Sequence, residues 1–428
     1  MKFFHYPERR RVFTLSVVLF RVMLIGFAGL LARAQTLTTE LPVPNIGDLT
    51  RVDRNTLPSP QDTNTATYIL KTSSHATMGD AYVVVTDQTD AAFLDPLERL
   101  AQFHHGSIVH VNDLGALRTS ATERDQLISD LRRAQPRFVA IAPKLSSFTE
   151  NMLLGMWNVL AMLSDDQQLP VFPGILVAPN QTAFNSLIDR SINYSPQTVG
   201  QIRPFVMGQV LGPKPFGLRS LQKIRMMRNL FTDHGCATHS LVILAYTAVE
   251  RGVNIAPATD QWQVAMSRPD QSIEMIPPDA RPALDDASLL LMFGHGNPDT
   301  VCNLNVSDFR DVRMTNKTVM CGDCFSASIQ GNDESFAMRA VENGADVVYA
   351  HMRENAGFPH LFPVLEAWMN GLTVGEAYQR QINALLAFNG FSADDLISRN
   401  VADANALLYV IIGDPALQPL AKMTPATL

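Results

Sequence analysis

Short apolar runs alternate with amphipathic stretches along most of this chain, and this alternation constrains the fold more than any other feature. In the first half, the predicted strands are 81–86, 107–111, 137–142 and 170–178. The predicted helices between them, which have apolar residues at helical spacing, are 93–103, 122–134 and 152–163. Strands separated by helices of ~10–15 residues favour a parallel sheet covered by helices on both faces. The sequence therefore predicts an α/β protein.

The same alternation resumes after a segment rich in proline and glycine between residues 201 and 219, which indicates an internal boundary. Beyond it, the predicted helices are 241–251, 335–343, 362–369 and 373–386. The predicted strands are 289–293, 317–322, 346–350 and 406–412. A chain of 428 residues, 46% of them hydrophobic, is long enough for two such units. We expect an N-terminal α/β subdomain over 71–215 and a second one over 216–428.

The N-terminus carries an export pattern. Lys2 and the run 9–11 of arginines precede an apolar stretch over 12–31, which ends in the small-residue pattern of 32–34. This order is typical of a signal peptide cleaved after residue 34, so we expect an exported protein, whether secreted, periplasmic or attached to the cell envelope. The apolar stretch is also long enough to cross a bilayer, so an uncleaved anchor is the alternative and the only predicted membrane contact. Residues 35–70 lack periodicity and are predicted to be a linker or a propeptide-like lead-in.

Charge and cysteine content narrow the class of protein. The formal net charge of -7 gives no electrostatic reason to bind nucleic acid. Four cysteines are too few for a disulfide-stapled scaffold in an exported chain of this length, which leaves room for a reactive thiol. They are Cys236, Cys302, Cys321 and Cys324.

Two predicted strands end in reactive side chains. The strand over 289–293 is followed by Gly294, His295 and Gly296, and the strand over 317–322 by Asp323 and Cys324. If these strands are parallel neighbours, the histidine and the cysteine lie side by side at one edge of the sheet. A cysteine thiol needs such a base, because little of it is thiolate near neutral pH. The backbone N–H groups of Gly296 and Cys324 could then form an oxyanion hole.

Other interpretations of these residues stay open. Cys321 and Cys324 have the Cys-x-x-Cys spacing of zinc and dithiol sites. No second pair of ligands completes a zinc site in the sequence, and the motif neither follows the first strand nor opens a long helix, as a dithiol fold requires. Cys236, between His234 and His239, is a second candidate thiol. A strand-end histidine is also often an ordinary loop residue, and a buried cysteine is often a small hydrophobic side chain.

A strand ending in His-Gly followed by a strand ending in Cys resembles the caspase-like clan of cysteine peptidases, and the longer match is to its gingipain-type members. The segment 323–327 looks like the Asp-x-Cys-His-Ser-Gly turn of metacaspases. The segments 337–350, 371–377 and 409–417 resemble, in order, further elements of gingipain-type peptidases. The resemblance covers about residues 80–420 and implies a caspase-like three-layer α/β/α sandwich, preceded by a smaller nucleotide-fold-like α/β subdomain.

The resemblance implies a cysteine-type endopeptidase that acts on proteins or peptides through His295 and Cys324. These residues are 324 − 295 = 29 positions apart, near but not at the spacing expected of gingipains. Cys321 therefore remains a rival nucleophile, although it lies within the apolar strand while Cys324 falls in the turn. The carboxylate that orients the histidine in relatives has no assigned counterpart, although Asp285, Asp286 and Asp299 are near in sequence.

The resemblance also leaves two points open. Calcium is a cofactor that it allows, but no dense loop of oxygen ligands is present in the sequence. A catalytically inactive binding or assembly protein of the cell envelope is the alternative function, because a fold does not fix an activity.

Overall fold

The computed structural model describes most of the chain from Met78 to Ala421, within one compact unit that spans Asp53–Leu428. The described residues are 78–210, 230–231, 233–235, 242–247, 255–258, 262–265, 281–294, 296–302, 304–329, 334–354 and 358–421. The predicted signal peptide and lead-in, residues 1–70, lie outside this set. Among the described helices, none combines the length and the apolar character needed to cross a membrane.

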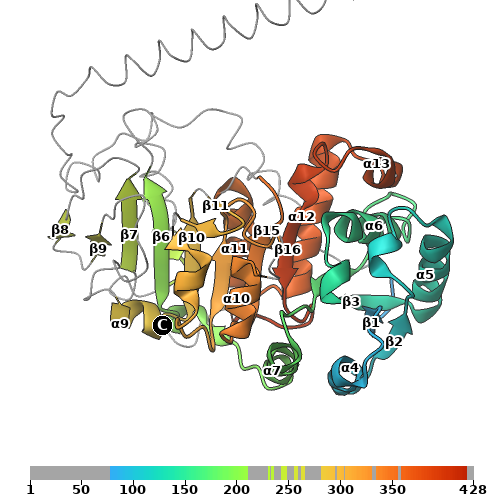
Figure 1. Cartoon of the computed structure of the whole chain (residues 1–428), viewed down its shortest axis with the longest axis horizontal. Coiled ribbons are helices and arrows are strands. Elements are labelled where there is room, and N and C mark those ends of the chain that lie inside the picture. The colour runs from blue at the N-terminus through green and yellow to red at the C-terminus, as the bar shows by residue number, and fades with distance from the viewer. Residues whose placement is uncertain are drawn as a thin grey trace, which may run out of the picture. The chain divides into compact units, whose positions relative to one another are not determined.

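Twelve of the described strands form one sheet, in the order β2-β1-β3-β4-β16-β15-β14-β10-β6-β7-β9-β8 (Figure 1). Neighbouring strands are parallel except in the pairs β15–β16 and β8–β9, which are antiparallel. The strands are β1 (Ala81–Thr86), β2 (Ser107–His110), β3 (Pro136–Ala142), β4 (Phe172–Ile175), β6 (Pro204–Val210), β7 (Val242–Thr247), β8 (Ile255–Ala258), β9 (Trp262–Ala265), β10 (Leu289–Phe293), β14 (Thr318–Cys321), β15 (Val347–His351) and β16 (Tyr409–Ile412). The mixed, mostly parallel sheet confirms the predicted α/β class.

The described helices pack against this sheet and against one another. They are α4 (Ala91–Phe103), α5 (Ala121–Ala134), α6 (Glu150–Ala161), α7 (Gln181–Ile192), α9 (Arg281–Asp286), α10 (Phe336–Glu342), α11 (Phe358–Met369), α12 (Val374–Asn389) and α13 (Ala393–Ser398). The longest, α12, shows why these boundaries form. Thr373 and Glu376 make a capping box at its start, and Gly390 ends it in the left-handed conformation that glycine adopts readily.

One predicted helix is wrong. Within the range 241–251, Val242–Thr247 is the strand β7, which is parallel to β6 and β9. The run is apolar up to Tyr246 and shows no alternation of apolar and polar residues, so its pattern could not distinguish a strand from a helix. The described part of the segment 201–219, which the proline and glycine content indicates as an internal boundary, contains the strand β6. Pro204 opens that strand, a position where a missing N–H is tolerated.

The two halves of the sheet are tied together near β16. β4 and β16 meet through a single residue pair, Ile175 and Ile412. Just beyond β16, the buried carboxylate of Asp414 accepts a hydrogen bond of 2.9 Å from the hydroxyl of Tyr82 on β1. Its other oxygen lies 2.7 Å from Nε2 of His104, which stacks on the ring of Tyr82. The segment that follows β16, the last strand of the large sheet in chain order, is therefore hydrogen-bonded to β1, the first strand of that sheet.

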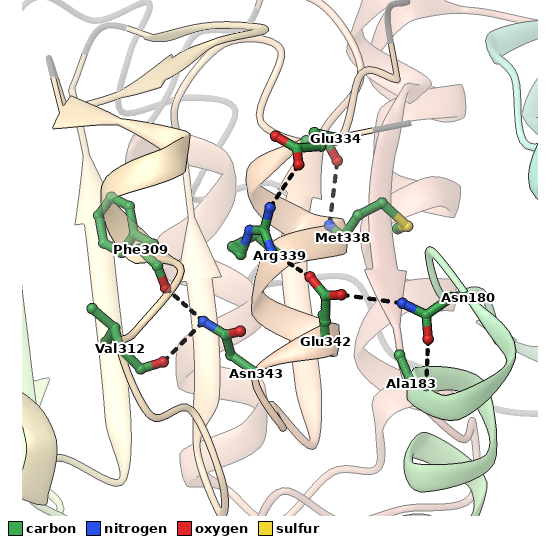
Figure 2. Close-up of polar contacts among 10 residues, drawn as sticks. Asn180, Ala183, Phe309, Val312, Glu334, Met338, Arg339, Glu342 and Asn343 are labelled. Carbon is green, nitrogen blue, oxygen red and sulfur yellow. Dashed lines mark hydrogen bonds and ion pairs between the residues drawn. The ribbon is translucent and has the colours of Figure 1, made fainter. Parts of the chain in front are cut away.

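A second tie joins α10, which follows the cysteine region, to α7 of the first half (Figure 2). Arg339 on α10 is only 9% exposed and pairs with Glu334 at 2.8 Å and with Glu342. Glu342 also accepts a hydrogen bond of 3.1 Å from the side chain of Asn180, which caps α7 through the N–H of Ala183. Glu342, which pairs with the buried guanidinium of Arg339, thus connects two helices that are far apart in the sequence.

Candidate active site

The two strands that carry the predicted reactive residues are parallel neighbours. In the register of β10 and β14, Met292 lies beside Cys321, and every residue of both strands is buried. The pairing continues one residue further, because the N–H of Gly322 donates to the carbonyl oxygen of Met292 at 2.8 Å. The condition set by the sequence, that the two strands are parallel neighbours, is therefore met. His295 itself lies outside the described residues.

Gly296 lies against the cysteine turn. It begins β11 (Gly296–Asn297), the first strand of a small antiparallel sheet that continues with β12 (Thr300–Val301) and β13 (Leu304–Asn305). A Cβ atom on Gly296 would lie 2.6 Å from the carbonyl oxygen of Cys324 and 2.9 Å from the Cβ of Asp323. Because real Cβ atoms do not come that close, this contact requires a glycine.

The turn that bears Cys324 is fastened to the end of β15. The N–H of Phe325, whose φ of 58° is left-handed, donates to the carbonyl oxygen of Arg353 at 3.0 Å. Ser326 acts as a bridge: its hydroxyl donates to the carbonyl oxygen of Asp323 at 2.9 Å and accepts the N–H of His351 at 3.1 Å. These bonds hold the turn in a conformation that a bulky residue such as Phe325 rarely adopts.

The neighbouring thiols differ in accessibility. Cys321 is completely buried, and burial, followed by the nearby carboxylate of Asp323, raises its pKa well above the ordinary value. Cys324 is half-buried and so presents the more accessible sulfur. Since the thiolate is the reactive form, Cys321 is poorly suited to act as a nucleophile. The other candidate thiol, Cys236, lies outside the described residues.

No group of three or more histidine, cysteine, aspartate or glutamate side chains among the described residues is arranged to hold a metal ion. The Cys-x-x-Cys spacing of Cys321 and Cys324 thus gains no further ligand from the described part of the chain.

Asp323, directly before Cys324, is a completely buried carboxylate. Burial raises its pKa to about 6, while hydrogen bonds from Cys302 and from the backbone of Gly294 oppose that increase. Its Oδ2 accepts the backbone N–H of Cys302. Asp323 therefore contacts both ends of the loop over 294–302, in which Gly296 lies.

A buried aromatic cluster adjoins the cysteine turn, and the sequence did not indicate it. Tyr409 on β16 pairs with His351 on β15 in the antiparallel register, and its ring stacks on His360 of α11 at 4.9 Å between centroids. Burial lowers the pKa of His351 to about 3 and that of His360 to about 4, so both imidazoles are neutral near pH 7. Burial and then the nearby Cys324 raise the pKa of Tyr409.

The three aspartates near His295 in sequence lie in two different places. Asp285 and Asp286 end α9, which leads into the start of β10, so they lie at the opposite edge of the sheet from Cys324. Asp299 is exposed in the turn between β11 and β12, where its N–H donates to the side chain of Asn297 at 2.9 Å. Of the three, only Asp299 is on the same edge as Cys324.

Comparison with known proteins shows which solved structures share this fold. No protein-family model matches the sequence, and no curated protein matches it. The crystal structure of the Arg-specific cysteine proteinase gingipain R matches with a TM-score of 0.54, covering 81% of this chain and 79% of that chain at 14% identity. The fold is gingipain-like. The complex of the pro- and mature domains of RgpB from Porphyromonas gingivalis matches with a TM-score of 0.53, covering 80% of each chain at 12% identity.

The gingipain-like fold agrees with the caspase-like α/β arrangement that the resemblance implied. An identity of 12–14% extends that agreement no further than the backbone arrangement. The chemistry of this chain must therefore be argued from its own residues.

Proposed function

We propose that this chain is a cysteine-type endopeptidase in which Cys324 is the nucleophile, His295 the base and Gly296 an oxyanion donor. The observation that carries the proposal is the close contact between Gly296 and Cys324 at the ends of parallel neighbouring strands. A cysteine peptidase needs an accessible thiol with a backbone donor beside it. Cys324 is half-buried and lies against the backbone of Gly296, whereas Cys321 is completely buried, and this difference supports the assignment.

In the proposed reaction, His295 accepts the Cys324 proton and the thiolate attacks the carbonyl carbon of the peptide bond. The backbone N–H groups of Gly296 and Cys324 stabilise the negative charge that develops on the carbonyl oxygen. Collapse of this intermediate breaks the C–N bond, and His295 returns its proton to the leaving amine. Water, deprotonated by His295, then hydrolyses the thioester and releases the carboxylate product and the thiol.

The proposed substrates are proteins or peptides, and the proposed location is outside the cytoplasm. Export rests on the basic and apolar pattern of residues 2–34, with membrane attachment only if that segment stays uncleaved.

The deciding experiment is hydrolysis of a mixed fluorogenic peptide library under reducing conditions by protein that lacks residues 1–34. Cys324→Ala should abolish cleavage, whereas Cys321→Ala should retain most of it. If neither the parent protein nor protein trimmed by limited proteolysis cleaves any peptide, the endopeptidase is rejected in favour of an inactive binding or assembly protein.

A further inference from the structure

Asp323 joins two loops that belong to different strands. It follows β14 in the turn that bears Cys324, and its Oδ2 accepts the N–H of Cys302, which is 21 residues away in the sequence. The backbone N–H of Gly294 also lies close enough to stabilise its negative charge. The two donors come from the two ends of the loop over 294–302, so one carboxylate holds both ends.

This carboxylate is placed where a charge is costly. Asp323 has no exposed surface, and its Oδ1 forms no hydrogen bond of good geometry with a described residue. A buried carboxylate is strongly disfavoured unless its hydrogen bonds compensate for the lost water. The donors from Cys302 and Gly294 therefore compensate part of the lost hydration, and the same contacts anchor the loop.

Gly296 is the part of the loop that this anchor affects most directly. The backbone of Gly296 is packed onto the Cβ of Asp323 and the carbonyl oxygen of Cys324, so any movement of the loop changes its distance from the cysteine. We propose that Asp323 is a positioning residue, whose carboxylate holds the loop over 294–302 against the cysteine turn and so sets the place of Gly296 beside Cys324. Its effect on turnover rests on the proposed endopeptidase function, but its effect on the loop does not.

Hydrogen exchange in the full chain tests the anchor without any substrate. In Asp323→Ala, the backbone amide of Cys302 loses its acceptor and should exchange about 10-fold faster or more, since hydrogen bonds to charged groups are among the stronger ones. Asp323→Asn keeps an oxygen acceptor and should stay within about 3-fold of the parent protein. Asp346→Asn, which alters a buried carboxylate at the opposite edge of the sheet, should leave the exchange of Cys302 unchanged. An unchanged rate in Asp323→Ala overturns the proposal.

Kinetics on the peptide found by the library then test the consequence for the reaction. Asp323→Ala should lower kcat by about 10-fold or more while changing KM by less than about 3-fold. The reason is that a displaced oxyanion donor stabilises the transition state less but leaves the binding of the substrate nearly unchanged. Asp323→Asn should recover most of kcat. Equal losses in Asp323→Asn and Asp323→Ala, or a loss no larger than the unfolded fraction, contradict the proposal.

Failure of the endopeptidase function and failure of the positioning role of Asp323 give different results. If the parent protein cleaves nothing, the endopeptidase function fails, while the exchange rate of Cys302 still decides whether Asp323 holds the loop. If Asp323→Ala does not fold, Asp323→Ser replaces it, since its shorter hydroxyl does not reproduce the carboxylate contact but leaves a polar group in place.

Discussion

A Cβ atom on residue 296 would lie 2.6 Å from the carbonyl oxygen of Cys324, so these two residues fit together only while residue 296 has no side chain. Gly296→Ala must therefore push the loop away from the cysteine turn. We expect kcat to fall about 100-fold or more, the loss typical of removing one oxyanion donor. Steady-state kinetics on the preferred peptide measure the effect.

The matched control for that substitution is Gly390→Ala at the end of α12. Gly390 has a φ of 63° and no atom within 4 Å of the place that a Cβ would occupy, so the added methyl group meets strain but no neighbour. We expect a loss of about 1 kcal/mol in the free energy of unfolding and an unchanged kcat. Equal losses of kcat in both variants would show that Gly296 acts only through stability.

The difference in burial between Cys321 and Cys324 predicts which thiol reacts. Burial raises the pKa of Cys321, and it also blocks access to the sulfur. Iodoacetamide at pH 7 should therefore modify Cys324 about 10-fold faster or more than Cys321. Peptide mass spectrometry gives both rates, and unfolding in denaturant should make them similar. Faster modification of Cys321 in the folded protein contradicts this assignment.

The ion pairs of Arg339 predict a stability effect remote from the site (Figure 2). Arg339→Met keeps most of the apolar stem of the side chain but removes the guanidinium that joins Glu334 and Glu342. Both glutamates are at least one-third exposed and can be rehydrated, so we expect a modest loss of about 2 kcal/mol in the free energy of unfolding. Denaturant titration measures it.

The control for Arg339→Met is Arg133→Ala. Arg133 is 76% exposed and pairs with Asp130 at 3.2 Å on the same helix, so its loss should change the free energy of unfolding by less than about 0.5 kcal/mol. An equal effect of the two substitutions would remove the special role given to the buried guanidinium.

Asp346 predicts a pH dependence of stability. Burial raises its pKa to about 7, against about 3.9 in an unfolded chain, although Arg190 opposes the shift. The folded protein then binds more protons than the unfolded chain between about pH 4 and 7, so this group's contribution to stability is lost as pH rises through that range. The slope is at most about 1.4 kcal/mol per pH unit.

Asp346→Asn removes the titrating group. Thermal unfolding of both proteins between pH 4.5 and 8 should therefore show the Tm of the variant rising relative to that of the parent protein as pH increases. A constant or opposite difference would mean that Asp346 is already ionised in the folded protein at low pH.

The strands at the site could be predicted because they are short, wholly apolar and bounded by turn residues. The predicted strands 289–293 and 317–322 correspond to β10 and β14 within a residue at each end. The rule that reactive groups gather at the carboxyl ends of parallel strands directed attention to these two strand ends, but the sequence left their adjacency as a condition, which the structure supplies. The burial of Cys321 and the greater accessibility of Cys324 could likewise be inferred from their positions within the strand and the turn.

Contacts that depend on register could not be predicted. Tyr409 and His351 meet because β16 runs antiparallel to β15 with one particular alignment, which the local pattern of either strand does not encode. The bond between Asp323 and Cys302 likewise depends on how the loop over 294–302 folds back. β7 was missed for a different reason, since an unbroken apolar run carries no period.

β16 is the last in chain order of the twelve strands in the described sheet, yet it lies inside the sheet, between β4 and β15. During synthesis, this interior strand therefore leaves the ribosome after the other eleven strands of the described sheet. Until Ile412 has been synthesised, the edge of β15 that pairs with β16 has no partner strand. β15 is also the strand whose His351 is hydrogen-bonded to Ser326 in the turn of Cys324. The order of synthesis thus delays completion of the sheet around this thiol until nearly all of the described chain has been made.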